Sequence, residues 1–198
     1  MSFLAGCAAL AALELDATLI AQTLLSRPLV AGAVMGVLLG RAQAGALFGA
    51  SYELLGLCDL PVGGCMNWSG TVAAGSAVLL AGAGASFATC FAGGLAVGVA
   101  HARVEAFDRA RRARSGDALA VRAEAGGSSL GRSLGASIAA HAAMTFAVAG
   151  AAAALIAFAD GRWWPVLPDS LRAGATLAAS SAPWIGLSGV AMRGLRRA

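Results

Sequence analysis

Residues 27–64 read RPLVAGAVMGVLLGRAQAGALFGASYELLGLCDLPVGG. The stretch is mostly apolar and is spaced by glycines, yet it carries an acid, Glu53, well inside it. A carboxylate at membrane depth costs about 2.5 to 3.5 kcal/mol on insertion scales, so chains keep one where it faces protein or a water-filled site. Glu53 is therefore a candidate functional residue.

Glycines recur at every fourth position of this stretch, in two rows: Gly32, Gly36 and Gly40, then Gly45 and Gly49. This spacing lets two helix backbones approach closely. Glu53 follows Gly49 by four residues, and residues four apart share one face of a helix. The pattern predicts that Glu53 points into protein.

The composition of the whole chain indicates a membrane protein. Of the 198 residues, 59% are hydrophobic and 12% are charged, and the mean hydropathy is +0.76. Soluble domains have about 25% charged residues. The sequence has long apolar runs, whereas a transmembrane β-barrel needs short segments that alternate between apolar and polar residues. We expect an all-α, polytopic transmembrane protein with roughly six hydrophobic segments.

The expected apolar segments are residues 3–25, 28–40, 43–58, 71–100, 133–159 and 173–192. The first is interrupted by Glu14, Asp16 and Gln22, and the fourth fits either one tilted span or a span plus a partial one. A helix of 13 residues, such as 28–40, reaches about 20 Å, which is less than the roughly 30 Å hydrocarbon core. Short segments of this kind predict re-entrant or broken helices near a transporter's binding region.

Arginine alone supplies the basic charge, because the chain has no lysine and a net charge of +4. Seven arginines lie in residues 101–132, and three more lie in the C-terminal tail. Basic segments mark the cytoplasmic face, so this pattern favours membrane topology over nucleic-acid binding. The loop that begins at Asp160 and contains Trp163 is then extracytoplasmic.

Three regions follow from this reading. Residues 1–100 form an N-terminal membrane region with the candidate site, and residues 133–198 form a C-terminal membrane hairpin with a basic tail. Residues 101–132 form a charged cytoplasmic loop, expected as a solvated helix and loop or, alternatively, as a docking surface for a soluble partner.

The sequence lacks the motifs of soluble enzymes, and we expect neither a cofactor nor a metal. His101 and His141 are 40 residues apart, which is not a ligand spacing. We expect His101 to be solvated and His141 to be a hydrogen-bonded core residue, with a proton or sugar ligand as the alternative.

A polar set remains in the first 70 residues: Asp16, Gln22, Arg27, Glu53, Asn67 and Ser69. Carboxylates and amides offer the hydrogen bonds that suit the vicinal hydroxyls of a sugar. Two alternatives stay open. Glu53 fits an interhelical ion pair or hydrogen bond equally, and Arg27 fits a position near lipid headgroups or in an ion pair.

One family shares these residues. The series Arg27-Pro28-Leu29-Val30, Gly36 to Gly40, Gly45, Gly49, Tyr52-Glu53-Leu54 and Leu60-Pro61-Val62-Gly63 resembles the IIC subunit of the mannose/fructose/sorbose-family sugar phosphotransferase systems. The lead-in, with Asp16, Thr18, Gln22 and Ser26-Arg27-Pro28, is similar as well. Beyond Gly70 the similarity is a hydropathy pattern and a charged central loop.

The resemblance implies a multi-pass permease subunit of the bacterial inner membrane. Such a subunit binds and translocates a mannose-type sugar together with a IID membrane subunit, while soluble IIA and IIB phosphocarriers bring the phosphate. No catalytic residue is expected in this chain. The alternative is a non-transporting membrane scaffold or regulator that recruits the phosphocarriers through residues 101–132.

The resemblance also implies a sugar site. Gln22 and Glu53 fall at positions expected to line it. The loop after Pro61-Val62-Gly63 is expected to close on it through Gly63, Asn67, Ser69 and Thr71. The chain departs from the family in having Asn67-Trp68-Ser69 where a Pro-Asp pair is usual, and we expect a member shortened at the C-terminus.

Overall fold

The computed structural model describes residues 2–18, 23–57, 67–124 and 130–195, and within these ranges every regular element is a helix. The elements are α1 (Phe3–Thr18), η1 (Leu24–Ser26), α2 (Pro28–Leu38), α3 (Ala42–Gly56), α4 (Gly70–Gly82), α5 (Phe87–Glu124), α6 (Leu130–Trp163), η2 (Trp164–Val166) and α7 (Asp169–Leu195). The all-α prediction is confirmed.

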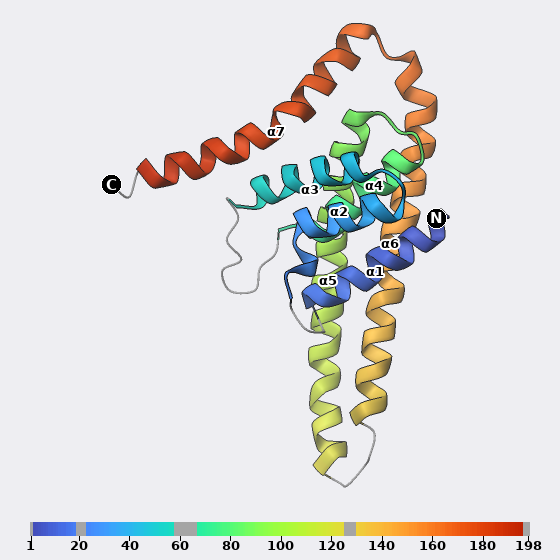
Figure 1. The fold of residues 1–198 in the computed structure, drawn as a ribbon. Coiled ribbons are helices and arrows are strands. Elements are labelled where there is room, and N and C mark those ends of the chain that lie inside the picture. Colours follow the sequence, from blue (N-terminus) through green and yellow to red (C-terminus); the bar gives the residue numbers. More distant parts are fainter. Residues whose placement is uncertain (1, 19–22, 58–66, 125–129, 196–198) are drawn as a thin grey trace.

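Two long helices, α5 and α6, run side by side, and the shorter helices α1 to α3 lie across their upper half (Figure 1). The α7 helix leaves the top of α6 and passes over α3. The α4 helix is central and contacts α1, α2, α3, α5 and α6. A helix that is apolar and small-sided all round is suited to such a buried place, and α4 is buried from Thr71 to Leu80.

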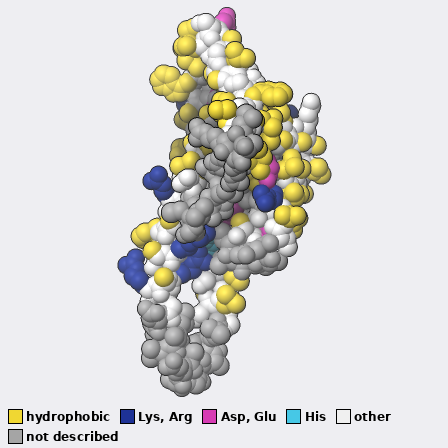
Figure 2. Space-filling model, turned by 90° about the vertical axis from the view of Figure 1, so that its left-hand side faces the viewer, with side chains coloured by type: hydrophobic (Ala, Val, Ile, Leu, Met, Phe, Trp, Pro, Cys, Tyr) yellow, Lys and Arg dark blue, Asp and Glu magenta, His cyan; other side chains and the backbone are white. Residues whose placement is uncertain are grey.

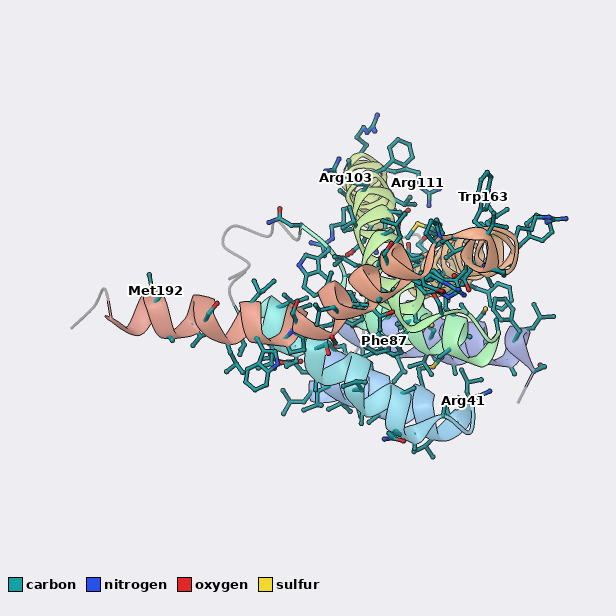
Figure 3. The ribbon with its side chains drawn as sticks, turned by 90° about the horizontal axis from the view of Figure 1, so that it is seen from above. Arg41, Phe87, Arg103, Arg111, Trp163 and Met192 are labelled. Atoms are coloured by element: carbon teal, nitrogen blue, oxygen red, sulfur yellow. The ribbon has the colours of Figure 1, made fainter. Side chains whose placement is uncertain are left out.

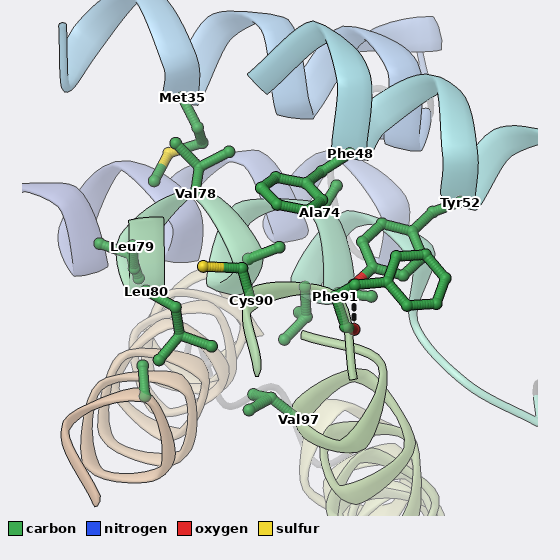
Figure 4. Close-up of a cluster of buried hydrophobic side chains, with 14 of the residues drawn as sticks. Met35, Phe48, Tyr52, Ala74, Val78, Leu79, Leu80, Cys90, Phe91 and Val97 are labelled. Carbon is green, nitrogen blue, oxygen red and sulfur yellow. Dashed lines mark hydrogen bonds between the residues drawn. The ribbon is translucent and has the colours of Figure 1, made fainter. Parts of the chain in front are cut away.

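Aromatic side chains join α3 to α5 in the core (Figure 4). The ring of Phe48 stacks on Phe87 with centroids 5.3 Å apart, and Tyr52 stacks on Phe91 at 5.1 Å. The Tyr52 hydroxyl donates a hydrogen bond to the backbone carbonyl of Phe91 at 2.5 Å. These contacts fix the C-terminal half of α3 over the start of α5.

Gly32 and Gly36 pack against Gly45 and Gly49 where α2 meets α3, a close backbone approach of the kind that their spacing allows. A Cβ atom on Gly45 would lie 2.2 Å from the Gly32 carbonyl oxygen, and one on Gly49 would lie 2.7 Å from that of Pro28. The turn between the helices uses Gly40, whose φ is +68°. The Arg41 amide donates to the Gly36 carbonyl at 2.6 Å, which is the hydrogen bond of a Schellman cap.

Two helical stretches in the described residues are long and apolar enough to cross a bilayer, by length and composition: Phe87–Arg114 in α5 and Gly131–Val166 in α6. The expected segment 173–192 lies in α7, which is interrupted by Pro183 and is not one of the two. Large hydrophobic side chains are exposed on α6 and α7, including Leu155, Phe158, Leu177 and Ile185. Figure 2 shows such side chains over the upper part of one face, with basic side chains below them.

The structure decides between two expected arrangements and corrects two details. Residues 71–100 contain a break, because α4 ends near Gly84, whose φ is +84°, and α5 begins at Phe87. Residues 101–124 are helical, as expected for part of this region, but His101, Glu105 and Asp108 within them are buried. The loop expected from Asp160 is wrong at its start, because α6 continues to Trp163.

Asp160 instead joins α6 to the N-terminus of α5. Its carboxylate accepts hydrogen bonds from the Ser86 amide at 2.9 Å and from the Ser86 hydroxyl at 3.1 Å, and it also accepts one from the Thr89 hydroxyl. A carboxylate at a helix N-terminus is stabilised by the unpaired amides and the helix dipole. The start of α5 and the end of α6 are thereby fixed to each other.

Candidate functional site

Two described members of the predicted sugar site, Glu53 and Thr71, contact residues 23–29, which we call the η1 corner. Asp16, near the end of α1, organises this corner. Its carboxylate accepts hydrogen bonds from the Thr23 amide at 3.0 Å, the Thr23 hydroxyl at 2.9 Å and the Ser26 amide at 3.2 Å. The corner turns the chain so that α2 begins at Pro28.

Glu53 reaches the η1 corner from α3. Its Oε1 lies 3.0 Å from Nη1 of Arg27, and its Oε2 accepts a hydrogen bond from the Leu29 amide at 3.4 Å. The side chain is 22% exposed, whereas that of Arg27 is 58% exposed. Glu53 therefore contacts protein as predicted, and the ion pair that the sequence left open is present. Leu29 lies in the first turn of α2, so the Glu53 carboxylate caps this helix. The N-cap residue Arg27 makes no cap hydrogen bond with its own side chain.

The first turn of α4 contacts the same corner. The Thr71 hydroxyl donates to the Ser26 carbonyl at 2.5 Å, and a Cβ on Gly70 would lie 2.5 Å from Cγ of Pro28. Ser69 caps α4 by accepting a hydrogen bond from the Val72 amide at 3.2 Å. Thr71 therefore contacts the corner that Glu53 also contacts, whereas the Ser69 side chain bonds within α4 and to the residues behind it.

The other predicted residues do not join this arrangement. Asn67 is exposed, at the start of the described part of the loop. Gln22 and Gly63 lie outside the described residues. The contacts that define the corner therefore come from Glu53 and Thr71, together with Asp16 and Arg27 from the polar set.

Behind Ser69 lies a buried acid–base cluster that the sequence reasoning missed. The Ser69 hydroxyl donates to Oε1 of Glu14 at 3.0 Å, and the same oxygen is 3.8 Å from Nδ1 of His101. His101 Nε2 lies 2.9 Å from the Thr145 hydroxyl. Glu14, His101 and Thr145 are fully buried, and Glu105 is nearly so. The expectation that His101 is solvated is wrong.

A second layer of charged groups continues along α5. The His141 ring lies edge-on to the His101 ring with centroids 6.1 Å apart, and its Nδ1 is 3.8 Å from Asp108. Asp108 pairs with Arg111 at 2.8 Å and with Arg112 at 3.1 Å. His141 is buried, in agreement with the prediction of a core histidine.

One signal in the sequence points to half of this cluster. His101, Glu105 and Asp108 follow each other at four and three residues, a spacing that puts them on one helical face. The other half needs tertiary structure, because Glu14 comes from α1 and His141 from α6. The spacing of the two histidines in the sequence does not show that Glu14 of α1 lies beside His101.

A cavity of about 240 Å³ lies elsewhere. It is lined by residues from α1, α4 and the α2–α3 turn: Phe3, Leu39, Arg41, Leu79, Gly82 and Ala83. It includes no member of the predicted sugar site.

Comparison of the chain with protein-family models, with curated proteins and with solved structures found no match.

Proposed function

We propose that this chain is the sugar-binding permease subunit of a mannose-type phosphotransferase system, with several passes through the bacterial inner membrane. It would work with a IID membrane subunit and with soluble IIA and IIB phosphocarriers. The observation that carries the proposal is the convergence of Glu53 and Thr71 on the η1 corner. These two residues come from separate parts of the predicted sugar site.

The corner offers suitable chemistry for a neutral polyol. Glu53 supplies two acceptor oxygens, and carboxylates accept hydrogen bonds from vicinal hydroxyls. Arg27 covers this carboxylate with a half-exposed, flexible side chain. In the proposed mechanism the guanidinium moves aside and sugar hydroxyls donate to Glu53. The phosphoryl transfer itself belongs to the phosphocarriers, so no residue of this chain has to accept phosphate.

The test compares E53Q with R27Q in the assembled IIC–IID complex. A hydrogen bond to a charged group contributes about 1.5–3 kcal/mol, so E53Q should weaken binding of labelled mannose, fructose or sorbose by roughly 10- to 150-fold. R27Q breaks the same ion pair but leaves the carboxylate, so it should retain sugar binding. Size-exclusion chromatography checks that both variants assemble.

Unchanged sugar binding by E53Q would overturn the site. Equal loss by E53Q and R27Q would show that the ion pair matters only for the structure of the corner. Sugar uptake and phosphoenolpyruvate-dependent sugar phosphorylation, with and without this chain, test the function as a whole.

A second function, a scaffold that recruits phosphocarriers, is favoured by one observation. Arg103, Arg109, Arg111 and Arg114 are exposed along α5, and Figure 3 shows Arg103 and Arg111 at the edge of the molecule opposite α2 and α3. Binding of the soluble phosphocarriers to membranes that contain this chain distinguishes the two functions. A scaffold would lose carrier recruitment in an R103Q/R114Q variant and would be indifferent to E53Q.

A further inference from the structure

We propose that Glu14, His101 and Glu105 bind one divalent first-row transition-metal ion, such as Zn²⁺ or Mn²⁺, inside the helix bundle. Neither the sugar site nor the scaffold function requires this metal site, and it rests on different residues. The three side chains come from α1 and α5 and meet behind the Ser69 loop.

The ligand atoms are close enough for a metal site. One nitrogen or oxygen from each side chain lies within 4.8 Å of the others, and all three residues are buried. Zinc binds nitrogen and oxygen ligands at about 2.0–2.2 Å in a tetrahedral arrangement, so neighbouring ligand atoms are about 3.3–3.6 Å apart. Side-chain shifts of less than about 1 Å would therefore bring these atoms to coordination distance.

His101 gives an independent sign that a ligand is needed. Its Nδ1 atom is fully buried and has no hydrogen-bond partner among the described residues. It points toward Glu14 Oε1 at 3.8 Å, which is too long for a hydrogen bond. A buried polar atom without a partner is costly. A cation between His101 and Glu14 would give this nitrogen a partner.

Thr145 prepares His101 for this role. Its hydroxyl lies 2.9 Å from Nε2 of the ring. When Nε2–H donates to the hydroxyl, Nδ1 carries the free electron pair that a metal requires. Histidine ligands commonly have their second nitrogen bonded in this way, which fixes the ring and its tautomer. Ser69 orients Glu14 similarly, through its hydrogen bond to Oε1.

The charge of the cluster favours a divalent cation. Glu14 and Glu105 are two buried carboxylates, and burial of charge is costly unless it is paired. Arg109 contacts Glu105 through Nε at 2.9 Å and Nη2 at 2.5 Å, but both contacts go to Oε1. The other oxygen of Glu105 is not used by Arg109. One imidazole with carboxylates suits Zn²⁺ or Mn²⁺ better than Mg²⁺ or Ca²⁺, which prefer oxygen ligands alone.

The protein is purified in detergent, freed of metal with a chelator and then titrated with the metal ion. Calorimetry with Zn²⁺ and with Mn²⁺, together with elemental analysis of the protein, should show one bound ion per chain. H101Q and E14Q should abolish this binding. T145V should weaken it by about 10- to 100-fold, the usual effect of losing an outer-shell partner.

Two controls remove carboxylates elsewhere: D169N, at a position exposed on α7, and E53Q at the sugar site. Both should bind metal as the unmodified chain does, so the two proposals can fail separately. Unmodified protein that binds neither ion would overturn the metal site, as would folded H101Q that binds with unchanged affinity. If H101Q does not fold, unchanged metal affinity in T145V overturns it.

Discussion

Tyr52 fixes the position of α3 over α5 with both ends of its side chain. Its ring stacks almost parallel to that of Phe91, with an interplanar angle of 9°, and its hydroxyl donates to the Phe91 carbonyl. The hydroxyl has room only because residue 94 is glycine, where a Cβ atom would lie 2.6 Å from it. Glu53 is the next residue in the chain, so Tyr52 also positions the carboxylate at the η1 corner.

Removal of this hydroxyl in Y52F should lower the free energy of unfolding by about 0.5–1.5 kcal/mol, because one buried hydrogen bond is lost while the ring contact is kept. Denaturant-induced unfolding of the purified protein in detergent measures the change. A stability equal to that of the unmodified chain would show that the hydroxyl makes no net contribution.

The α2–α3 hairpin depends on glycine at the contact between its two backbones. Ala at position 45 would place a methyl group against the Gly32 carbonyl, and the helices would have to separate. Overpacking of this kind costs about 1–3 kcal/mol or more. We expect G45A to lower the thermal stability of the protein in detergent.

Gly135 provides the matched control, because it lies inside α6 and a Cβ atom there would meet nothing within 4 Å. Replacing an interior helical glycine by alanine stabilises a helix by roughly 0.5–1 kcal/mol. G135A should therefore be neutral or stabilising. If G45A behaved as G135A does, the close approach of α2 and α3 would not matter for stability.

Local signals predicted these two elements well. Pro28 marks the start of α2, and glycine spacing predicts a close helix contact without naming the partner; the expected segments 28–40 and 43–58 correspond to Pro28–Leu38 and Ala42–Gly56. Residues 101–132 were harder. Their many charges suggested solvent, but Asp108 is buried because neighbouring arginines on α5 pair with it. Its contact with His141 depends on tertiary packing, which one sequence does not specify.

The same limit applies to the candidate site. The sequence predicted Glu53 as a functional residue, with an ion pair as the alternative role. The structure shows that Glu53 forms an ion pair with Arg27. Glu14 received no role, since nothing in residues 3–25 indicates that His101 lies beside it. Contacts between distant segments decide both sites.

The length of α6, together with the arginines of residues 101–132, predicts the side of the membrane on which each end of α6 lies. The 34 residues of α6 rise about 50 Å, enough to separate its ends by more than a hydrocarbon core. In a cysteine-free background, G131C should react with an impermeant maleimide from the cytoplasmic side, and V166C should react from outside the cell. A153C, at a buried position in α6, is the unreactive control. Labelling of both end positions from one side would contradict this topology.

The contact between Asp160 and the start of α5 has a mechanical consequence. Three donors on two residues, Ser86 and Thr89, bind one carboxylate, so a shift of α5 along α6 by one turn would break all three bonds together. We therefore expect the two long helices to keep this register and to move together in a conformational change. Motion of α4 relative to the pair would use the turn at Gly84, where φ is positive.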